Sequence, residues 1–325
     1  MFQSARLAPN IVFLDRATLP AQMEYPPLPF EHQWTDYAQT TKDQVVERLQ
    51  GASIAITNKV VLDKEILSQL PDLKLIVVAA TGFNNIDVSI CQKQGIAVSN
   101  LQGYSTPSVP EHVIAMMFAL KRNLKGYHND IAAGEWQRSE HFCFFTHPIR
   151  DVAGTTFGVI GAGAIGKACA DMAKALSMNV VYAERKGVQN CREGYLPFER
   201  VIAISDVLTL HCPLNEQTHN LIGKKELQAM KTSCVLINTG RGGLVDEKAL
   251  VDALKQGEIA GAGVDVFTQE PADISNPLIA NMNLPNLLLT PHVAWGGEAS
   301  FPKIAKILIS NIIAFVEGRE QNRIV

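Results

Sequence analysis

The sequence predicts an α/β protein with two doubly wound parallel sheets, each in its own domain. Two series of short apolar runs that alternate with helical patterns support this prediction, one in the first hundred residues and one after residue 155. With 325 residues, of which 47% are hydrophobic, the chain is long enough to fill two domain cores.

The first series begins near the N-terminus, and its apolar runs are rich in Ile, Val and Leu. Residues 20–39 are irregular and rich in proline, so we expect no regular structure there. The expected strands are residues 11–14, 54–57 and 75–79, and the expected helices are residues 44–50, 63–69 and 87–94.

A helix that begins near residue 108 marks the passage to the second domain. Ser108 and Glu111 have the Ser-x-x-Glu spacing of a capping box, and the apolar residues 113–120 follow them. We therefore place the crossing between the domains at residues 103–107. Residues 123–151 begin with a helical pattern and then become polar and aromatic.

The second series predicts six strands in one sheet, joined by right-handed crossovers. A last amphipathic helix, residues 301–317, is expected to return to the first domain. The expected domains are therefore residues 1–103 with 293–325 and residues 104–292. The expected strands are residues 156–160, 180–183, 207–210, 235–238, 261–265 and 287–289, and the helices between them include residues 165–176 and 246–256.

The composition excludes several classes of protein. A net charge of −3 without a basic cluster argues against a nucleic-acid-binding surface. The six cysteines form no CxxC pair, so we expect no metal site and interpret them as free thiols in a reducing compartment. The residues around Arg6 lack the apolar run of a signal peptide, and no apolar run is long enough to span a membrane. We therefore expect a cytoplasmic protein.

Three glycines follow the first strand of the second series in the pattern GxGxxG. Gly161 would make a tight turn, Gly163 would let the backbone approach a pyrophosphate, and Gly166 would let the helix pack on the strand. The amide groups near Ala164 and Ile165 would face the phosphates at the positive end of the helix. The pattern predicts a Rossmann domain that binds a dinucleotide.

An acidic residue ends the next strand, as this type of site requires. Glu184 can accept hydrogen bonds from both ribose hydroxyls of NAD, and its charge would repel a 2′-phosphate. Arg185 and Lys186 follow it, and either could reach the extra phosphate of NADP. We favour NAD because of the position of the acid. The alternative interpretation is a structural glycine turn with a surface glutamate.

Three side chains that follow late strands have the chemistry needed to reduce a small 2-keto acid. Arg241 can bind a carboxylate bidentately, His292 can donate a proton near neutral pH, and Glu270 can orient the imidazole. Open α/β sheets bind ligands at the carboxyl ends of their strands, where all three occur. Each residue alone is more often a surface or packed side chain, so the prediction depends on their occurrence together.

At this point the chain resembles the D-isomer-specific 2-hydroxyacid dehydrogenases over nearly its whole length. The resemblance is carried by residues 79–87, 158–166 and 211–222, and by the segments around the three predicted catalytic residues. The glycerate dehydrogenase, or hydroxypyruvate reductase, branch is the most similar, judged by Ala-Glu-Arg-Lys-Gly at 183–187 and Pro-His-Val-Ala-Trp at 291–295.

The resemblance implies a fold, a reaction and a set of roles. It implies a flavodoxin-like substrate domain and a Rossmann NAD-binding domain with a cleft between them, and the reduction of hydroxypyruvate or glyoxylate to D-glycerate or glycolate. Arg241 would bind the substrate, His292 would be the acid in reduction and the base in oxidation, and Glu270 would pair with His292. The implied substrate-binding residues are Gly82, Phe83, Arg241 and His292, and the implied cofactor-binding residues beyond the phosphate loop and Glu184 are Thr106, Cys212, Pro213, Thr218, Thr239, Gly240, Arg241, Asp265 and His292.

The resemblance also implies a homodimer built through the cofactor domain, with neither nucleic acid nor a membrane as a partner. The helix at residues 108–120 and the aromatic residues 136–145 are the candidates for the contact, unless both pack within one chain. Trp295 has two interpretations, as a core residue or as a substrate contact.

Three other functions are compatible with this fold. A formate dehydrogenase would pair the histidine with Gln rather than with Glu270. A phosphoglycerate dehydrogenase commonly carries a C-terminal regulatory domain, which we do not expect after residue 325. A non-catalytic NADH sensor that recruits partners, like the corepressors of this fold, is the alternative outside the enzymes, and turnover of hydroxypyruvate with NADH distinguishes it.

Overall fold

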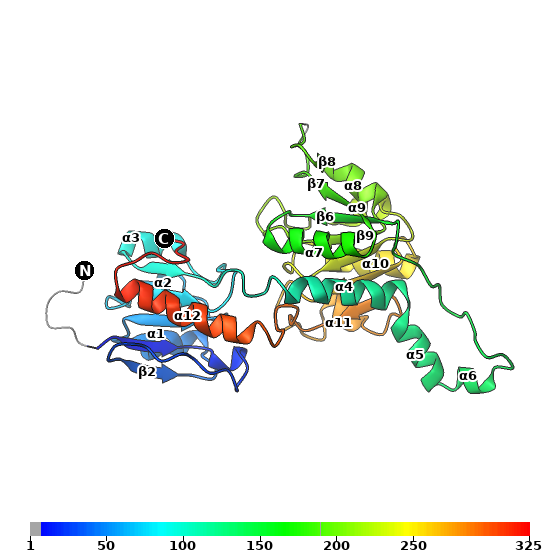
Figure 1. Ribbon diagram of the computed structural model, residues 1–325. Coiled ribbons are helices and arrows are strands. Elements are labelled where there is room, and N and C mark those ends of the chain that lie inside the picture. Colours follow the sequence, from blue (N-terminus) through cyan, green and yellow to red (C-terminus); the bar gives the residue numbers. More distant parts are fainter. Residues whose placement is uncertain (1–7, 189) are drawn as a thin grey trace. The chain divides into compact units, whose positions relative to one another are not determined.

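The computed structural model describes residues 8–188 and 190–325 and contains two compact units. The first unit comprises the described residues up to Tyr104 together with Gly297–Val325, and the second comprises Ser105–Gly296. Figure 1 shows a sheet with flanking helices in each unit. We named Arg6 when we argued from sequence against a signal peptide. This residue lies outside the described residues. In the part of the chain that is described, no helix is long and apolar enough to cross a membrane.

The first unit is built on a five-stranded parallel sheet. Its strands are β1 (Asn10–Phe13), β2 (Gln33–Asp36), β3 (Ile54–Thr57), β4 (Leu75–Val78) and β5 (Ala97–Ser99). Its helices are η1 (Arg16–Thr18), η2 (Lys42–Gln44), α1 (Val45–Leu49), α2 (Lys64–Leu67), α3 (Val88–Gln94) and α12 (Phe301–Val316). The strand order is β2-β1-β3-β4-β5, and every pair is parallel.

Alternate residues of these strands face different layers. Val12, Ala55, Ile76 and Val98 share one buried cluster with apolar residues of α1, α2 and α3. Helix α12 packs against β4 with apolar residues that are not part of that cluster. The near-continuous apolar strands are therefore buried on both faces, as expected for a parallel sheet.

The expectation that residues 20–39 have no regular structure is wrong, because β2 lies within them. Gln33–Asp36 pairs in parallel with β1, with Asn10 opposite Gln33 and Phe13 opposite Asp36. The strand forms the edge of the sheet and is mostly exposed. Apolar and polar residues do not alternate along this strand. The backbone hydrogen bonds to β1, rather than the burial of side chains, therefore hold it in the sheet.

The C-terminal segment belongs to the first unit. After α12 the chain turns back, and Arg323 forms an antiparallel bridge with Ser99 of β5. The Ile324 amide donates to the Val98 carbonyl at 2.7 Å, and the Val98 amide donates to the Val325 carbonyl at 3.1 Å. These bonds fasten the chain end to the edge strand β5, a three-residue strand that the sequence pattern did not reveal.

The second unit is built on a seven-stranded parallel sheet. Its strands are β6 (Thr156–Ile160), β7 (Asn179–Ala183), β8 (Tyr195–Leu196), β9 (Val207–Leu210), β10 (Val235–Asn238), β11 (Gly261–Val264) and β12 (Leu287–Leu289). Its helices are α4 (Ser108–Lys121), α5 (Leu124–Ala132), α6 (Glu135–Arg138), α7 (Ala164–Ala175), α8 (Phe198–Ile204), α9 (Lys224–Ala229), α10 (Glu247–Gln256) and α11 (Pro277–Ala280). The order is β12-β11-β10-β9-β6-β7-β8, so the order reverses at β6, as in doubly wound dinucleotide-binding sheets. The prediction of six strands missed β8, which has only two residues.

Two helical layers cover the second sheet. Phe157, Val159 and Ile237 pack with buried residues of α4 and α7 on one face, where Figure 1 shows these helices side by side. Leu208 and Leu236 pack with residues of α8, α9, α10 and α11 on the other face. The strand order reverses at β6, which is an inner strand, so the segment that follows β6 lies at the switch point of the sheet, where such sheets bind ligands.

The capping box expected at Ser108 does not form. Helix α4 already begins at Ser108, its N-cap is Pro107, and no side chain caps it. Pro107 has helical φ and ψ angles, so the helical path starts before the position that the Ser-x-x-Glu spacing indicates.

Candidate active site

Three neighbouring strands of the second sheet end at the same level. Asn238 on β10 is the register partner of Val264 on β11, and Val264 is the partner of Leu289 on β12. Arg241 comes three residues after Asn238, and His292 comes three residues after Leu289. The register therefore brings the loops that carry two of the predicted catalytic residues to one edge of the sheet.

The third predicted residue, Glu270, is hydrogen-bonded to His292. The distance between His292 Nδ1 and Glu270 Oε2 is 2.7 Å, and both side chains are partly exposed, at 24% and 29%. The other carboxylate oxygen of Glu270 accepts a hydrogen bond from the Phe267 amide at 3.0 Å. Because the backbone fixes the carboxylate and the carboxylate fixes Nδ1, Nε2 is the ring nitrogen that remains for a ligand.

The backbone of His292 adopts a conformation that needs support. Its φ of 55° lies in the left-handed region, which a residue with a side chain rarely adopts. The His292 amide donates to the Asp265 carbonyl at 2.7 Å, and Trp295 Nε1 donates to the His292 carbonyl at 2.8 Å. Both backbone groups of the proton-donor candidate are thus held, and Trp295, whose role the sequence left open, is one of the residues that hold it.

The Asp265 carboxylate organises the loop around His292. It is fully buried and accepts hydrogen bonds from the amides of Val293 and Ala294, each at 2.9 Å, and from the Thr290 hydroxyl. The Thr290 hydroxyl is also 3.0 Å from His112 Nε2 on α4. These contacts hold the His292 loop in place, whereas the expected contact of Asp265 with a nicotinamide stays a prediction.

Arg241 has no acidic partner in the residues that the structure describes. It is partly buried, and its Nη1 donates to the Gly240 carbonyl at 2.7 Å. A Cβ atom on the adjacent Gly242 would stand 1.8 Å from the Phe267 carbonyl oxygen. The loop of Arg241 therefore packs directly on the backbone that holds Glu270. A guanidinium without a carboxylate at this place is suited to bind an anionic ligand.

The GxGxxG segment has the geometry that a phosphate loop needs. Gly161 has a φ of 96°, and a Cβ atom there would stand 2.5 Å from the Cys212 nitrogen. A Cβ atom on Gly166 would stand 2.1 Å from the Gly161 oxygen, so only glycine lets α7 approach the loop this closely. Gly163, the N-cap of α7, has open space where its Cβ would be. The amides of Ala164 and its neighbours thus begin the helix beside an open cradle.

The segment after β9 packs against the glycine loop at Gly161. Burial lowers the pKa of His211 to about 4, and it raises the pKa of the Cys212 thiol to about 11, so both are neutral near pH 7. The Thr218 hydroxyl donates to the Pro213 carbonyl at 2.7 Å and accepts from the Asn215 amide at 2.8 Å. The expected cofactor residue Thr218 thus shapes its own loop, and any contact with the cofactor stays a prediction.

A buried hydroxyl at the end of β10 supports the fit of a dinucleotide. Thr239 is 8% exposed, and its Oγ1 is buried without a hydrogen-bond partner among the described residues. The next residue, Gly240, donates its amide to Asn238 Oδ1 at 3.1 Å. An unpartnered buried hydroxyl is costly unless a ligand satisfies it. The open cradle at Gly163 and this hydroxyl therefore both fit a bound NAD.

Glu184, the acid expected to bind the adenosine ribose, forms an ion pair with Arg192. Glu184 is 4% exposed and forms a two-point ion pair with Arg192, with Nε to Oε2 at 2.7 Å and Nη2 to Oε1 at 2.9 Å. The Arg192 side chain, followed by the amides of Arg185 and Arg192, lowers the pKa of Glu184 to about 2. Lys186 binds Glu226 at 2.9 Å instead of facing this site. The contact of Glu184 with the ribose of a cofactor stays a prediction.

The remaining predicted residues lie elsewhere in the chain. Gly82 and Phe83 follow β4 in the first unit, where Phe83 is half-buried against the core and its carbonyl accepts a hydrogen bond from the Ile86 amide at 3.0 Å. Thr106 precedes α4 at the start of the second unit. Their roles in substrate and cofactor binding stay predictions.

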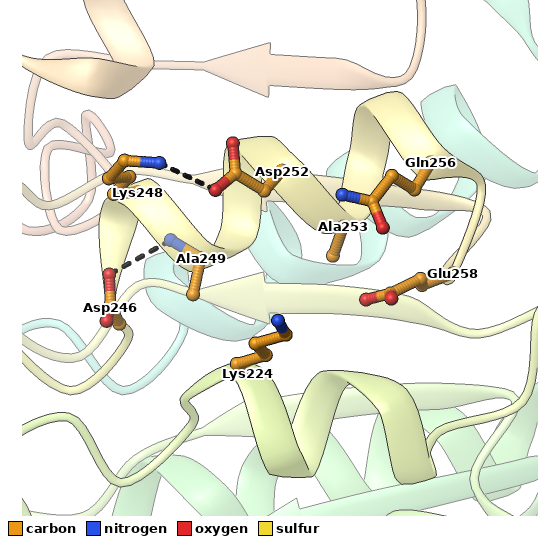
Figure 2. Close-up of a pocket in the computed structure, with 8 residues that line it drawn as sticks. All are labelled: Lys224, Asp246, Lys248, Ala249, Asp252, Ala253, Gln256 and Glu258. Carbon is orange, nitrogen blue, oxygen red and sulfur yellow. Dashed lines mark hydrogen bonds and ion pairs between the residues drawn. The ribbon is translucent and has the colours of Figure 1, made fainter.

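A charged pocket of about 260 Å³ lies between α9 and α10, away from these residues. Figure 2 shows Lys224 of α9 opposite Asp252 and Ala253 of α10, with Lys248 paired to Asp252 at 2.7 Å. None of the predicted site residues lines it, and two of its charged side chains, Lys248 and Asp252, pair with each other. We therefore do not assign the site to this pocket. Within residues 8–188 and 190–325, no group of His, Cys, Asp or Glu side chains is arranged to hold a metal ion.

Three residues of this edge have roles that the sequence pattern does not reveal. Arg192, eight residues after Glu184, carries no motif that would indicate its partner, because the pairing depends on the path of the loop. His112 lies on an apolar helix, where an isolated histidine is interpreted as an ordinary packed residue. The spacing of three residues between His292 and Trp295 is compatible with the contact to the His292 carbonyl, but it does not require that contact.

Comparisons with known proteins agree with this geometry. Residues 114–294 match the family model of the D-isomer specific 2-hydroxyacid dehydrogenase, NAD binding domain. The chain is 46% identical over 314 residues to a glycerate dehydrogenase of Methylorubrum extorquens, covering 96% of this chain and 98% of that protein. It is 34% identical over 289 residues to a hydroxypyruvate reductase of Blautia hydrogenotrophica, covering 87% and 88%. The structure of the D-lactate dehydrogenase from Aquifex aeolicus, complexed with NAD and lactic acid, superposes with a TM-score of 0.80 at 28% identity, over 95% of this chain and 96% of that one.

Proposed function

This chain belongs to the D-isomer-specific 2-hydroxyacid dehydrogenase family, and on that premise we propose that it reduces a small 2-keto acid with NADH and catalyses the reverse oxidation. Hydroxypyruvate and glyoxylate are the proposed substrates, with D-glycerate and glycolate as products. The names of the relatives, glycerate dehydrogenase and hydroxypyruvate reductase, support this choice.

The His292–Glu270 pair on the same sheet edge as Arg241 is the observation that carries the proposal. An imidazole held through Nδ1 at 2.7 Å can donate a proton from Nε2. Arg241 has no acidic partner among the described residues, so its guanidinium is available for the carboxylate of a keto acid. A cation, a proton donor and an orienting acid are the groups that this reduction needs.

Each of these side chains has one task in the proposed mechanism. Arg241 binds the substrate carboxylate and polarises the carbonyl, which orients the carbonyl carbon for reduction. When bound, NADH supplies the hydride. His292 gives its Nε2 proton to the carbonyl oxygen and takes it back in the oxidation. Glu270 stabilises the charged imidazole and keeps the proton on Nδ1.

We further propose that the first unit is the substrate domain. Gly82 and Phe83 follow β4 at the carboxyl end of its sheet, the side on which open α/β sheets bind ligands. Backbone amides at these two residues would contribute to binding the substrate carboxylate.

A panel of keto acids tests the proposed reaction. The purified chain is incubated with NADH and hydroxypyruvate, glyoxylate, pyruvate or a larger 2-keto acid, and NADH oxidation is followed. We expect the highest kcat/KM for hydroxypyruvate or glyoxylate, and the D enantiomer of glycerate as the product. If NADH binds but none of these acids is reduced, the proposed reaction is wrong and the non-catalytic NADH sensor takes its place.

We also propose that the protein is a cytoplasmic homodimer, with the aromatic residues 136–145 in the contact. Figure 1 shows α5 and α6 extending from the body of the second unit. Phe142 is 89% exposed and Phe145 78%, which is unusual for large apolar side chains in a monomer. Helix α4, the other candidate, uses Val113 and Met116 in the core of its own chain.

Light scattering of the purified chain tests the dimer. We expect the double variant F142D/F145D to be monomeric, because two charges would be buried without partners in the contact. The variant I274D changes an equally exposed residue, at 86%, outside this segment and should remain dimeric. A monomeric wild-type protein, or a dimeric F142D/F145D, would overturn the assignment.

A further inference from the structure

A hydrogen bond from Asn100 fixes the peptide group that carries the Gly82 amide. Asn100 Nδ2 donates to the Thr81 carbonyl at 2.7 Å. The peptide group between Thr81 and Gly82 is trans and planar, so the Thr81 carbonyl and the Gly82 N–H form one rigid unit and point in opposite directions. The Gly82 amide has no hydrogen-bond partner among the residues that the structure describes. A bond that holds the carbonyl therefore also sets the direction of a free N–H donor.

Two contacts of Leu101 hold the segment just before Gly82. The Leu101 amide donates to the Ala80 carbonyl at 3.0 Å, and the Leu101 carbonyl accepts from the Thr81 hydroxyl at 2.9 Å. Together with the Asn100 bond, these contacts join the segments that follow the neighbouring parallel strands β4 and β5. A hydrogen bond to a peptide carbonyl also polarises the peptide group and makes its N–H a stronger donor. The Gly82 amide is therefore held in one direction and strengthened as a donor.

The Asn100 side chain is buried, and both of its polar atoms have partners. Asn100 is 3% exposed, and its Oδ1 accepts from Gln102 Nε2 at 3.2 Å while its Nδ2 donates to the Thr81 carbonyl. A carbonyl partner on Nδ2 and an N–H partner on Oδ1 determine which way the amide is turned. A polar side chain in the interior destabilises the fold unless its hydrogen bonds are made. The two contacts satisfy this buried amide and make its orientation specific.

The C-terminal segment holds Asn100 in turn. Asn311 of α12 is 2% exposed, and its Nδ2 donates to the Asn100 carbonyl at 2.9 Å. Asn322 Nδ2 donates to Asn311 Oδ1 at 2.9 Å, and the Asn322 carbonyl accepts from the Asn100 amide at 3.2 Å. All of these residues belong to the first unit. Three asparagines thus connect the last residues of the chain to the peptide group of Gly82.

From this network we infer that Asn100 is a positioning residue for substrate binding, which holds the Gly82 amide for the keto-acid carboxylate, and that Asn311 and Asn322 hold Asn100 in this role. The inference rests on the proposed function, in which the amides of Gly82 and Phe83 contribute to binding that carboxylate. It gives the C-terminal segment, which is distant from Gly82 in the sequence, a part in substrate affinity.

The kinetics of the variant N100A separate positioning from a merely structural role. Without the side-chain amide, the peptide group of Gly82 loses the bond that orients it. We expect KM for hydroxypyruvate to rise by about threefold to tenfold, the effect of one neutral hydrogen bond. The kcat should stay within about twofold, because the carboxylate is bound in the ground state and in the transition state alike. Loss of folded protein would instead lower kcat and leave KM unchanged. That second pattern, or wild-type values of both constants in N100A, would overturn the inference.

Binding of oxamate tests the same role without turnover. Oxamate has the carboxylate and the adjacent carbonyl of a small 2-keto acid but accepts no hydride, so its titration into the NADH-bound chain gives a Kd. We expect this Kd to rise in N100A by the same factor as KM, while the Kd for NADH is unchanged. If the wild type binds NADH but neither binds oxamate nor reduces any of the keto acids, the proposed function fails. If the wild type and N100A bind oxamate equally, only the inference about Asn100 fails.

Two variants of the C-terminal segment extend the test, and they decide it where N100A does not fold. N322G removes the side chain that bonds Asn311, and glycine keeps the left-handed φ of 48° at this position without strain. We expect N322G to weaken oxamate binding by at least about twofold. S310A is the matched control, because the Ser310 hydroxyl joins α12 to Gln321 of the same segment, at 2.8 Å, without reaching Asn100. S310A should bind oxamate as the wild type does, and equal affinities of N322G and S310A would contradict the role of the C-terminal segment.

Discussion

His292 Nδ1 lies 2.7 Å from Oε2 of Glu270, and the second carboxylate oxygen is tied to the backbone at Phe267. The carboxylate therefore cannot swing away without losing a backbone hydrogen bond, and the imidazole is held in one orientation. Because the His292 amide and carbonyl are also bonded, to Asp265 and Trp295, ring and backbone are positioned together. This is the preorganisation that proton transfer to a carbonyl oxygen requires.

Replacing Glu270 by Gln should lower kcat for the reduction by about 100-fold. The amide keeps the shape of the side chain and can still hydrogen-bond His292 Nδ1, but it lacks the carboxylate charge that stabilises the imidazole during proton transfer. Steady-state kinetics with saturating NADH measures the change, with Glu199→Gln on α8 as the control. A kcat of E270Q equal to that of the wild type would discard the pairing as part of the mechanism.

Replacing Arg241 by Ala should weaken both keto-acid binding and its activation. Loss of a charged two-point contact is expected to lower kcat/KM by about 100-fold, and most of the change should appear in KM. Arg241→Lys keeps the charge but not the planar fork, so it should recover only part of the loss. Steady-state kinetics with saturating NADH measures both variants. A KM for keto acid that stays at the wild-type value in R241A would rule out the carboxylate contact.

Stability should fall as the pH drops from about 6.5 towards 4, and His211 should account for part of this. Burial lowers its pKa to about 4 in the folded protein, from 6.5. Between these values the unfolded chain binds the proton and the folded chain does not, so its contribution is complete above 6.5 and is lost as the pH falls. The loss is at most about 3 kcal/mol.

Chemical unfolding of H211Q at several pH values checks this expectation. The variant should lose less stability than the wild type over that interval, whereas H128Q, which changes an exposed histidine, should follow the wild type. Equal pH slopes for H211Q and the wild type would show that His211 is not buried in its neutral form.

Long apolar strands were predictable, and short or polar ones were not. The residues of β3 (Ile54–Thr57) and β10 (Val235–Asn238) are buried throughout, so their apolar runs marked them. β2 (Gln33–Asp36) is polar and exposed and exists only through its pairing with β1, which no local pattern encodes. β8 has two residues, too few for any periodicity. The sequence therefore predicted the inner strands of both sheets and the edge strand β12, but it did not predict the edge strands β2, β5 and β8.

The same division holds for the site. The position of Arg241 and His292 at one sheet edge could be predicted, because each follows a recognisable strand and the register of a parallel sheet aligns strand ends. Their catalytic roles stay predictions. Glu184 was located correctly at the end of its strand, but its state was not, because the partner Arg192 reaches it across an irregular loop. Tertiary pairing of this kind depends on loop conformation, which sequence spacing does not determine.

Turnover of His292→Gln, measured together with its affinity for NADH, tests the central claim most directly. Glutamine can keep a hydrogen bond to Glu270 but cannot act as an acid, so kcat for hydroxypyruvate should fall by about 100-fold to 10,000-fold. The Kd for NADH, followed by its fluorescence, should stay within about twofold of the wild type, because only the proton donor is removed. A near-normal kcat in H292Q with NADH bound would contradict the assignment of His292 as the proton donor.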